Sequence, residues 1–125
     1  MLYPMIIDKD DKYAAKADVI SKPVLQKQGT HKTRIVGKKG KEFIVIKLED
    51  VVLFYTVNKV TYAMDRNCIK SVCDGNLTDI ESRLDPAVFF RANRQYVLNI
   101  DFIKSYLTFE EVKLQVNLNV PALRH

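Results

Sequence analysis

The stretch 33-TRIVGKKGKEFIVIKLEDVVLFYTVNKVTYAMDRNCIKSV-72 decides the fold class, because β-branched and aromatic residues recur in it in short runs. Only tight turns fit between these runs, so we predict an antiparallel meander. Glycine or asparagine stands in the turns at 38–41, 57–59 and 66–67, where a positive φ costs these residues least. The predicted strands are Thr33–Lys38, Glu42–Ile46, Val51–Thr56, Val60–Asp65 and Cys68–Val72.

One short amphipathic helix is predicted after this β-rich stretch. Asn76 is a suitable N-cap, Asp79 falls in the first turn, and Asp85-Pro86 ends the helical pattern. The apolar face of the helix consists of Leu77, Ile80 and Leu84.

The rest of the chain completes a mostly β fold. Two further strands are predicted at Ile103–Phe109 and Val112–Leu118, with Glu110-Glu111 between them. Residues 1–31 are polar, lack periodicity and contain Pro23, so we expect a linker or an irregular segment there. Residues 32–125 then form one domain of short antiparallel sheets with one short helix.

Composition limits the function classes. A length of 125 residues with 47% hydrophobic residues suits one compact domain. The net charge of +5 favours a polyanionic partner, although solvated lysines give many domains such a charge. No apolar run approaches the roughly 18 residues that cross a bilayer, and no basic and apolar leader opens the chain. We therefore expect a soluble, cytoplasmic protein with no membrane partner.

Side chains suited to catalysis or metal binding are poorly placed. His31 and His125 lie in the N-terminal segment and at the end of the chain. Cys68 and Cys73 lack the close CxxC spacing of a zinc site, and no glycine-rich phosphate loop is present. We expect no enzymatic activity, no metal and no cofactor, and we interpret the cysteines as reduced, partly buried thiols.

A polar cluster, Arg91-Ala92-Asn93-Arg94-Gln95, lies between the apolar groups Phe89-Phe90 and Tyr96-Val97-Leu98. Apolar flanks hold such a loop rigidly, which suits recognition. Arginine matches the guanine edge and asparagine or glutamine the adenine edge in the major groove. For Arg91 and Asn99 we favour a structural role, in which they hydrogen-bond to the backbone of the loop. For Asn93 and Arg94, residue chemistry alone leaves both readings open.

From about Arg34 to Ile103 the sequence resembles a LytTR domain, the DNA-binding output domain of bacterial transcriptional regulators. The lysine-rich hairpin Val36–Ile44, leading into Ile46–Val51, is similar to the family's opening strands. Leu77–Pro86 is similar to the family's helix. The most specific motif, Phe89–Asn99 (FFRANRQYVLN), resembles the family's signature with every spacing kept.

The resemblance implies sequence-specific binding to double-stranded DNA, as the output domain of a two-component transcriptional regulator. In such proteins loops enter successive major grooves, and an upstream receiver domain drives homodimerisation on direct repeats. Asn93 and Arg94 stand at the positions of the family's base-facing pair. Asn58 and Lys59 fall in a hairpin that the family also sends toward DNA, although an ordinary β-turn explains them equally well. Lys38, Lys39 and Lys41 are weaker candidates, for contacts to phosphates.

The sequence departs from the family pattern in two ways. Asn93 replaces the commoner histidine and Gln95 the commoner serine, so the bases read can differ. The family also ends in a β-hairpin and a "VSR" motif, whereas this sequence ends at Val120–His125. We therefore expect the last strand to be missing, with an unpaired strand near Val112–Leu118, and we assign no DNA contact to Arg124.

Two other functions remain open. The chain could be a β-rich protein-interaction or small-ligand module, which exposed aromatic residues on one strand face would favour. It could also bind single-stranded nucleic acid on a sheet, with Tyr55, Tyr62 and Tyr96 as stacking platforms. Tyrosines that point into the core are the simpler account of these three residues.

Overall fold

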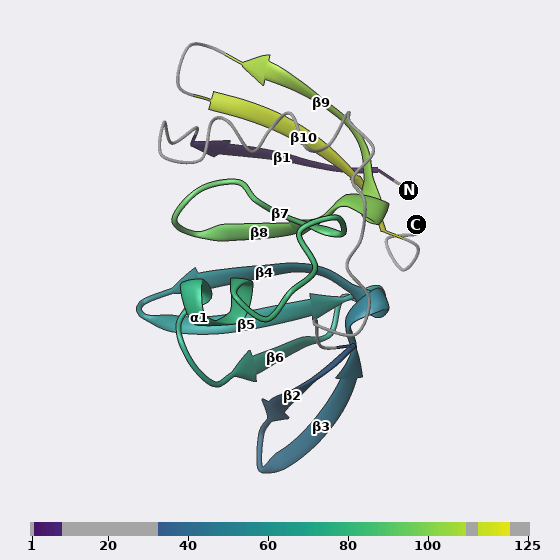
Figure 1. Cartoon of the computed structure of the whole chain (residues 1–125). Helices are drawn as coiled ribbons and strands as arrows, with labels where there is room; N and C mark the ends of the chain where they lie inside the picture. Colours follow the sequence, from purple (N-terminus) through teal and green to yellow (C-terminus); the bar gives the residue numbers. More distant parts are fainter. Residues whose placement is uncertain (1, 9–32, 110–112, 121–125) are drawn as a thin grey trace.

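The structure is a computed structural model that describes residues 2–8, 33–109 and 113–120. These residues form two antiparallel sheets, one short α-helix and two 3-10 turns, which confirms the mostly β class (Figure 1). The helix is α1 (Leu77–Glu81) and the turns are η2 (Leu48–Asp50) and η3 (Ile100–Phe102). The strands are β1 (Leu2–Asp8), β2 (Arg34–Lys39), β3 (Glu42–Lys47), β4 (Val51–Val57), β5 (Val60–Asp65), β6 (Lys70–Cys73), β7 (Phe89–Arg91), β8 (Tyr96–Asn99), β9 (Ile103–Phe109) and β10 (Lys113–Asn119).

The larger sheet has seven strands in the order β3-β2-β6-β5-β4-β8-β7. The predicted simple meander is therefore wrong, because β2 pairs with β6 and β3 is left at the edge. Gly37 of β2 makes this pairing possible. A Cβ on Gly37 would lie 2.8 Å from the Cβ of Ser71 on β6 and 2.9 Å from Cδ1 of Ile46, so only glycine lets the strands come this close.

The smaller sheet has the order β1-β10-β9, and it corrects two expectations. Residues 2–8, expected to be irregular, form β1 and pair with β10 over their whole length. Alternation explains this strand, because Ile7 is buried while Ile6 is exposed. Since β10 lies between β1 and β9, the expected unpaired strand near Val112–Leu118 is wrong. The remainder of the expected linker, residues 9–31, and Arg124 lie outside the described residues.

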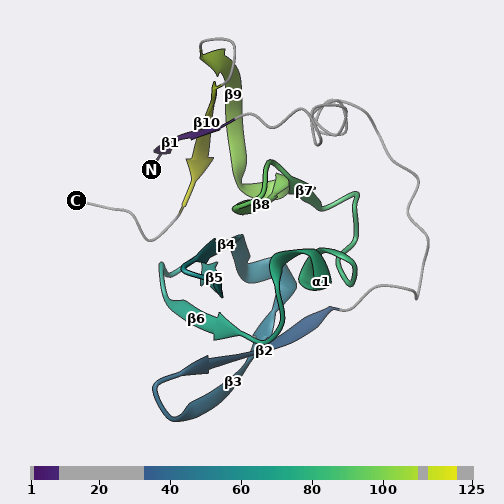
Figure 2. The ribbon, with the colours of Figure 1, turned by 90° about the vertical axis from the view of Figure 1, so that its left-hand side faces the viewer.

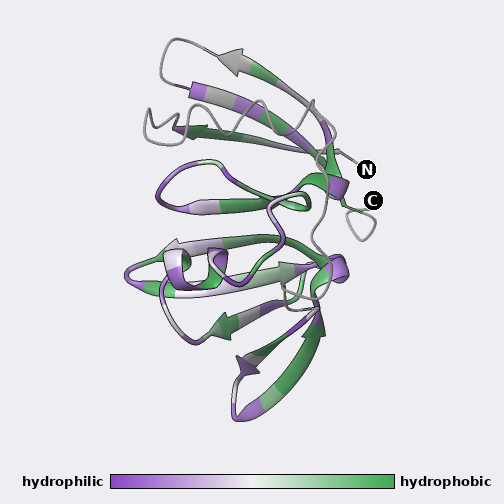
Figure 3. Cartoon of the chain, in the orientation of Figure 1, coloured by the Kyte–Doolittle hydropathy of each residue, from purple (hydrophilic) through white to green (hydrophobic). Residues whose placement is uncertain are grey.

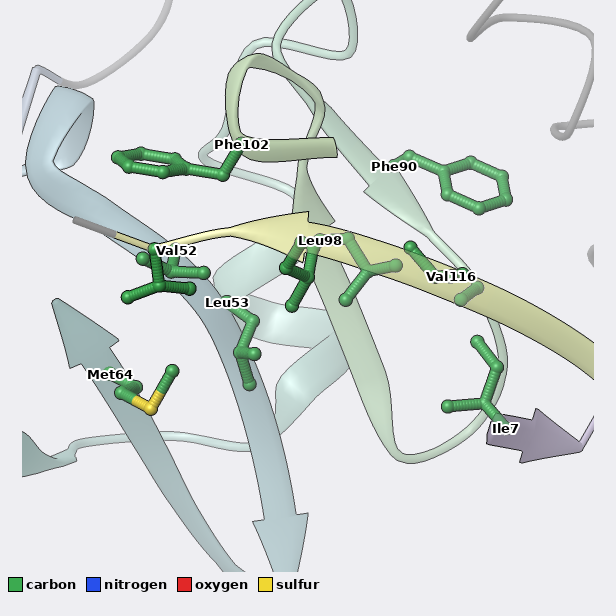
Figure 4. Close-up of a cluster of buried hydrophobic side chains, with 11 residues drawn as sticks. Ile7, Val52, Leu53, Met64, Phe90, Leu98, Phe102 and Val116 are labelled. Atoms are coloured by element: carbon green, nitrogen blue, oxygen red, sulfur yellow. The ribbon is translucent and has the colours of Figure 1, made fainter. Parts of the chain in front are cut away.

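Two hydrophobic clusters occupy opposite faces of the seven-stranded sheet, because alternate residues of each strand point to opposite sides. Leu53 of β4 faces the three-stranded sheet, where it joins Leu98, Val116 and Ile7 (Figure 4). Phe54, the next residue, faces α1. Figure 2 shows α1 against one side of the larger sheet and the smaller sheet beyond the β7–β8 pair.

Helix α1 begins as the sequence predicts. The side chain of Asn76 accepts a hydrogen bond from the backbone N–H of Asp79 at 2.8 Å, and the Asp79 carboxylate accepts one from the N–H of Asn76 at 3.4 Å. The helix ends at Glu81, earlier than the predicted Leu84, although Leu84 still packs in the core. Neither α1 nor any other helix of the described residues is long and apolar enough to span a membrane.

The hydroxyl of Thr61 on β5 provides a test of the core. Thr61 is 2% exposed, and its hydroxyl has no hydrogen-bond partner among the described residues. Burying a hydroxyl without a hydrogen-bond partner costs free energy, and a methyl group in its place removes this cost. We therefore expect Thr61→Val to raise the free energy of unfolding by about 1 kcal/mol, as measured by urea titration.

Thr56→Val is the matched control, because the Thr56 hydroxyl donates to the carbonyl of Val60 at 3.2 Å. This control should gain no stability. A loss of stability in Thr61→Val would show that its hydroxyl is hydrogen-bonded in solution.

Candidate nucleic-acid interface

Three connections of the seven-stranded sheet lie along one edge, which we call the loop edge. They are the β4–β5 turn (58–59), the β6–α1 connection (74–76) and the β7–β8 loop (92–95). The register fixes this arrangement, because a cross-strand row runs through Val72, Tyr62, Tyr55 and Tyr96, and each of these residues is within three positions of one of the connections. The β2–β3 turn (40–41) lies at the opposite strand ends, because β2 runs antiparallel to β6 with Lys38 beside Val72. The β4–β5 turn and the β7–β8 loop lie on the left side in Figure 1.

The β4–β5 turn presents Asn58 and Lys59. Both have positive φ, 51° and 68°, and Val57 pairs with Val60, so the two residues form a tight turn with the φ signs of type I′. Both side chains are exposed. The backbone N–H of Thr56 donates to the carbonyl of Gln95 at 3.0 Å, which ties this hairpin to the β7–β8 loop.

Arg91 is buried at the base of the β7–β8 loop, with 4% of the residue exposed. Its Nε donates to the carbonyl of Asn93 and its Nη2 to the carbonyl of Arg94, the second at 3.2 Å. Its Nη1 lies 3.1 Å from the carboxylate of Glu81 on α1. The predicted structural role of Arg91 is therefore observed, and α1 supplies the charge that a buried guanidinium requires.

Asn99 has a structural role, but its hydrogen bonds go to β4 and η3 and not to the β7–β8 loop as predicted. Its side chain is fully buried, donates to the carbonyl of Val51 at 2.8 Å and accepts from the backbone N–H of Asp101 at 2.9 Å. This amide fixes the point where β8 turns into η3.

Asn93, expected to face bases, is instead buried, with 4% of the residue exposed. Its Oδ1 accepts hydrogen bonds from the backbone N–H groups of Gln95, at 2.8 Å, and Tyr96, at 3.0 Å. Its Nδ2 donates to the carbonyl of Asp8 on β1 at 2.7 Å. This corrects the expectation, because an amide that holds its own loop and β1 is not presented to a groove in this conformation.

Arg94 and Gln95 are the exposed residues of the β7–β8 loop, as predicted for Arg94. The loop is hydrophilic in Figure 3, between hydrophobic segments of β7 and β8. Sequence reasoning did not assign a contact to Gln95, although its place next to Arg94 in the motif is a signal for one.

The lysines of the β2–β3 turn lie apart from this loop. Lys38, Lys39 and Lys41 are exposed, but β6, β5 and β4 separate their hairpin from β8. Gly40 has φ 63°, which a tight two-residue turn requires. Lys38 Nζ lies 5.6 Å from the ring centroid of Phe43, so its side chain runs over the sheet.

A family model described as the LytTr DNA-binding domain matches residues 41–122. The chain belongs to the LytTR family. A solved structure described as the LytTr DNA-binding domain of a response regulator from Bacillus cereus has the same fold, with a TM-score of 0.57 and 21% identity. The match covers 60% of this chain and 68% of that one. No curated protein matches the chain.

LytTR membership assigns DNA binding to the chain, and the family is not a catalytic one. Within the described part of the chain, no three His, Cys, Asp or Glu side chains form a group that could hold a metal ion. Cys68 is half-buried, Cys73 is buried, and both are free thiols. Burial raises the pKa of the Cys73 thiol to about 11, so this group stays protonated at neutral pH.

Asn93 of this LytTR domain provides a test of the loop. Removal of its amide leaves three backbone groups without their partner, so we expect Asn93→Ala to lower the free energy of unfolding by about 1–3 kcal/mol. Amide exchange of Gln95 and Tyr96 should also become faster. Gln95→Ala, at an exposed position of the same loop, should change neither quantity; equal stability of wild type and Asn93→Ala would contradict the assignment.

Proposed function

We propose that the chain binds double-stranded DNA in a sequence-specific way, as the output domain of a two-component transcriptional regulator. The observation that supports this proposal best is the exposure of Arg94 on a loop whose backbone is held by the buried side chains of Arg91 and Asn93. A guanidinium on a rigid support loses little entropy on binding and offers a fork of donors to guanine O6 and N7.

The proposal assigns different roles to the residues of the loop edge. Arg94 reads a base, and Gln95 beside it has an amide that matches the adenine edge. Asn58 and Lys59 approach the neighbouring part of the groove, because the Thr56–Gln95 hydrogen bond holds their turn next to this loop. Lys38, Lys39 and Lys41, on the β2–β3 hairpin outside the loop edge, contribute phosphate contacts. Asn93 acts through the loop that it holds and reads no base.

We also propose that two copies of the domain bind DNA together, each through its loop edge. One loop edge contacts a short run of base pairs, and two copies on a direct repeat would multiply the specificity of one. Homodimerisation through an upstream receiver domain, in a cytoplasmic regulator, is the arrangement that we propose. The net charge of +5 favours approach to the phosphate backbone.

Single-stranded nucleic-acid binding on the tyrosine row is not favoured. The rings of Tyr55 and Tyr62 stack on each other with centroids 5.2 Å apart, and Tyr55 and Tyr96 pack against the core. Burial raises the pKa of the Tyr55 hydroxyl, with the neighbouring Lys70 opposing the shift. The faces of these rings pack against other side chains, so little ring surface is available to stack with incoming bases.

Arg94→Ala tests the proposal. We expect the substitution to weaken binding to the cognate duplex by about 1–3 kcal/mol and to relax preference at one base pair, as for loss of a bidentate base contact. The cognate site is first obtained by selection from random duplex DNA. Binding of wild type and variant is then titrated on cognate and scrambled duplexes at several salt concentrations.

Lys39→Ala is the matched control for charge, because a phosphate contact should be lost equally on all sequences and should flatten the salt dependence. Unchanged affinity of Arg94→Ala for the cognate site would show that Arg94 reads no base. A selection that enriches no sequence would contradict specific binding itself.

A further inference from the structure

Strands β3, β2 and β6 have an outer face that points away from α1. This face carries exposed apolar side chains to which we assign no contact with DNA. Phe43 is 73% exposed and Val45 68% exposed on β3, Val36 is 53% exposed on β2 and Val72 40% exposed on β6. Large apolar residues this exposed on a small domain mark an interaction site when they are contiguous.

The register shows that these four residues form one patch. Val36 pairs with Val45, and Lys38 lies between Phe43 on one side and Val72 on the other. All of them share one side of the sheet because directly paired residues point to the same face. The patch spans three strands, which is about 10 Å at the usual strand spacing and about the width of one α-helix.

The charges on this face all have one sign. Period-two alternation places Arg34, Lys38, Lys47 and Lys70 on the outer face, and all four are exposed. The one carboxylate of these three strands, Glu42, pairs with Lys39 on the opposite face. The apolar patch is therefore surrounded by cations alone within these strands.

We propose that this outer face docks an acidic amphipathic helix of a partner protein. Leucine-like side chains of the helix pack on Phe43 and the valines, and its carboxylates pair with the surrounding lysines and Arg34. The docked helix would also cover the edge strand β3, which is mostly hydrophobic in Figure 3 and which the described residues leave uncovered.

Two other occupants fit this face less well. Two copies of the chain placed face to face would bring eight cations together, which costs free energy without a compensating carboxylate. Nucleic acid matches the cations but gives the three valines no apolar partner, and Phe43 is the one exposed aromatic ring of the patch. An acidic apolar segment matches both the charge and the valines.

The test uses the whole 125-residue chain labelled with 15N and an 18-residue synthetic helix with leucines on one face and glutamates on the other. We expect saturable shifts in the amides of β2, β3 and β6. A peptide with lysine in place of each glutamate should not bind. Phe43→Ser combined with Val45→Thr should weaken binding about tenfold or more, as loss of the central apolar contacts predicts.

Matched controls come from the three-stranded sheet. Leu107→Ser removes a side chain that is 47% exposed on β9 and should leave binding unchanged. Lys47→Glu should weaken binding, whereas Lys104→Glu, an exposed lysine of β9, should have no effect. The spectra of all variants report directly that each is folded.

Several outcomes would overturn the proposal. They are no saturable binding by wild type, shifts confined to other strands, equal binding of the lysine peptide, or equal binding by the Phe43/Val45 double variant. A monomer–dimer equilibrium abolished by the double variant in sedimentation would assign the face to a second copy, and shifts on this face with single-stranded DNA would assign it to nucleic acid. The double variant keeps every residue that we assign to duplex DNA, so loss of peptide binding with intact duplex binding separates the two proposals.

Discussion

The candidate site depends on the ion pair and hydrogen bonds of the buried Arg91 guanidinium. A charge that is 4% exposed is tolerable only when it is paired and its donors are satisfied. Glu81 of α1 supplies the opposite charge, and the carbonyls of Asn93 and Arg94 take further donors. The same side chain thereby fixes the position of α1 and the course of the β7–β8 loop, so the exposed Arg94 is presented from backbone that has little freedom to move.

Helix α1 can serve as this support only because packing and a cap stabilise it. Five residues are far too few for a helix to persist in water by itself. The capping box between Asn76 and Asp79 satisfies the first free N–H groups, and Leu77 and Ile80 pack into the core against the sheet. The apolar face thus positions the helix, and the polar face, through Glu81, positions the loop.

Local patterns predicted the approximate positions of β2–β6, β9 and β10, the helix N-cap at Asn76 and the fixing role of Arg91, because each depends on residues close in sequence. They did not predict β1, β7 and β8 as strands. Pairing between distant segments was not predictable in this way. The β2–β6 pairing depends on space that Gly37 leaves beside Ser71, and β1 is a strand only because β10 lies next to it. The role of Asn93 was not predictable for the same reason. An asparagine side chain can hydrogen-bond equally well to a base edge or to a backbone group, and its amide nitrogen donates to Asp8, 85 residues away in sequence.

The asparagine at position 93 explains why this loop can be held so firmly where the LytTR signature usually has histidine. A neutral imidazole has one donor and one acceptor nitrogen, whereas an amide oxygen accepts two hydrogen bonds while the amide nitrogen donates. The Asn93 oxygen accepts from two N–H groups of its own loop, and its amide nitrogen donates to the carbonyl of Asp8. In the proposed interface the exposed neighbours Arg94 and Gln95 read the bases, and strand β1 is part of the support that holds their loop.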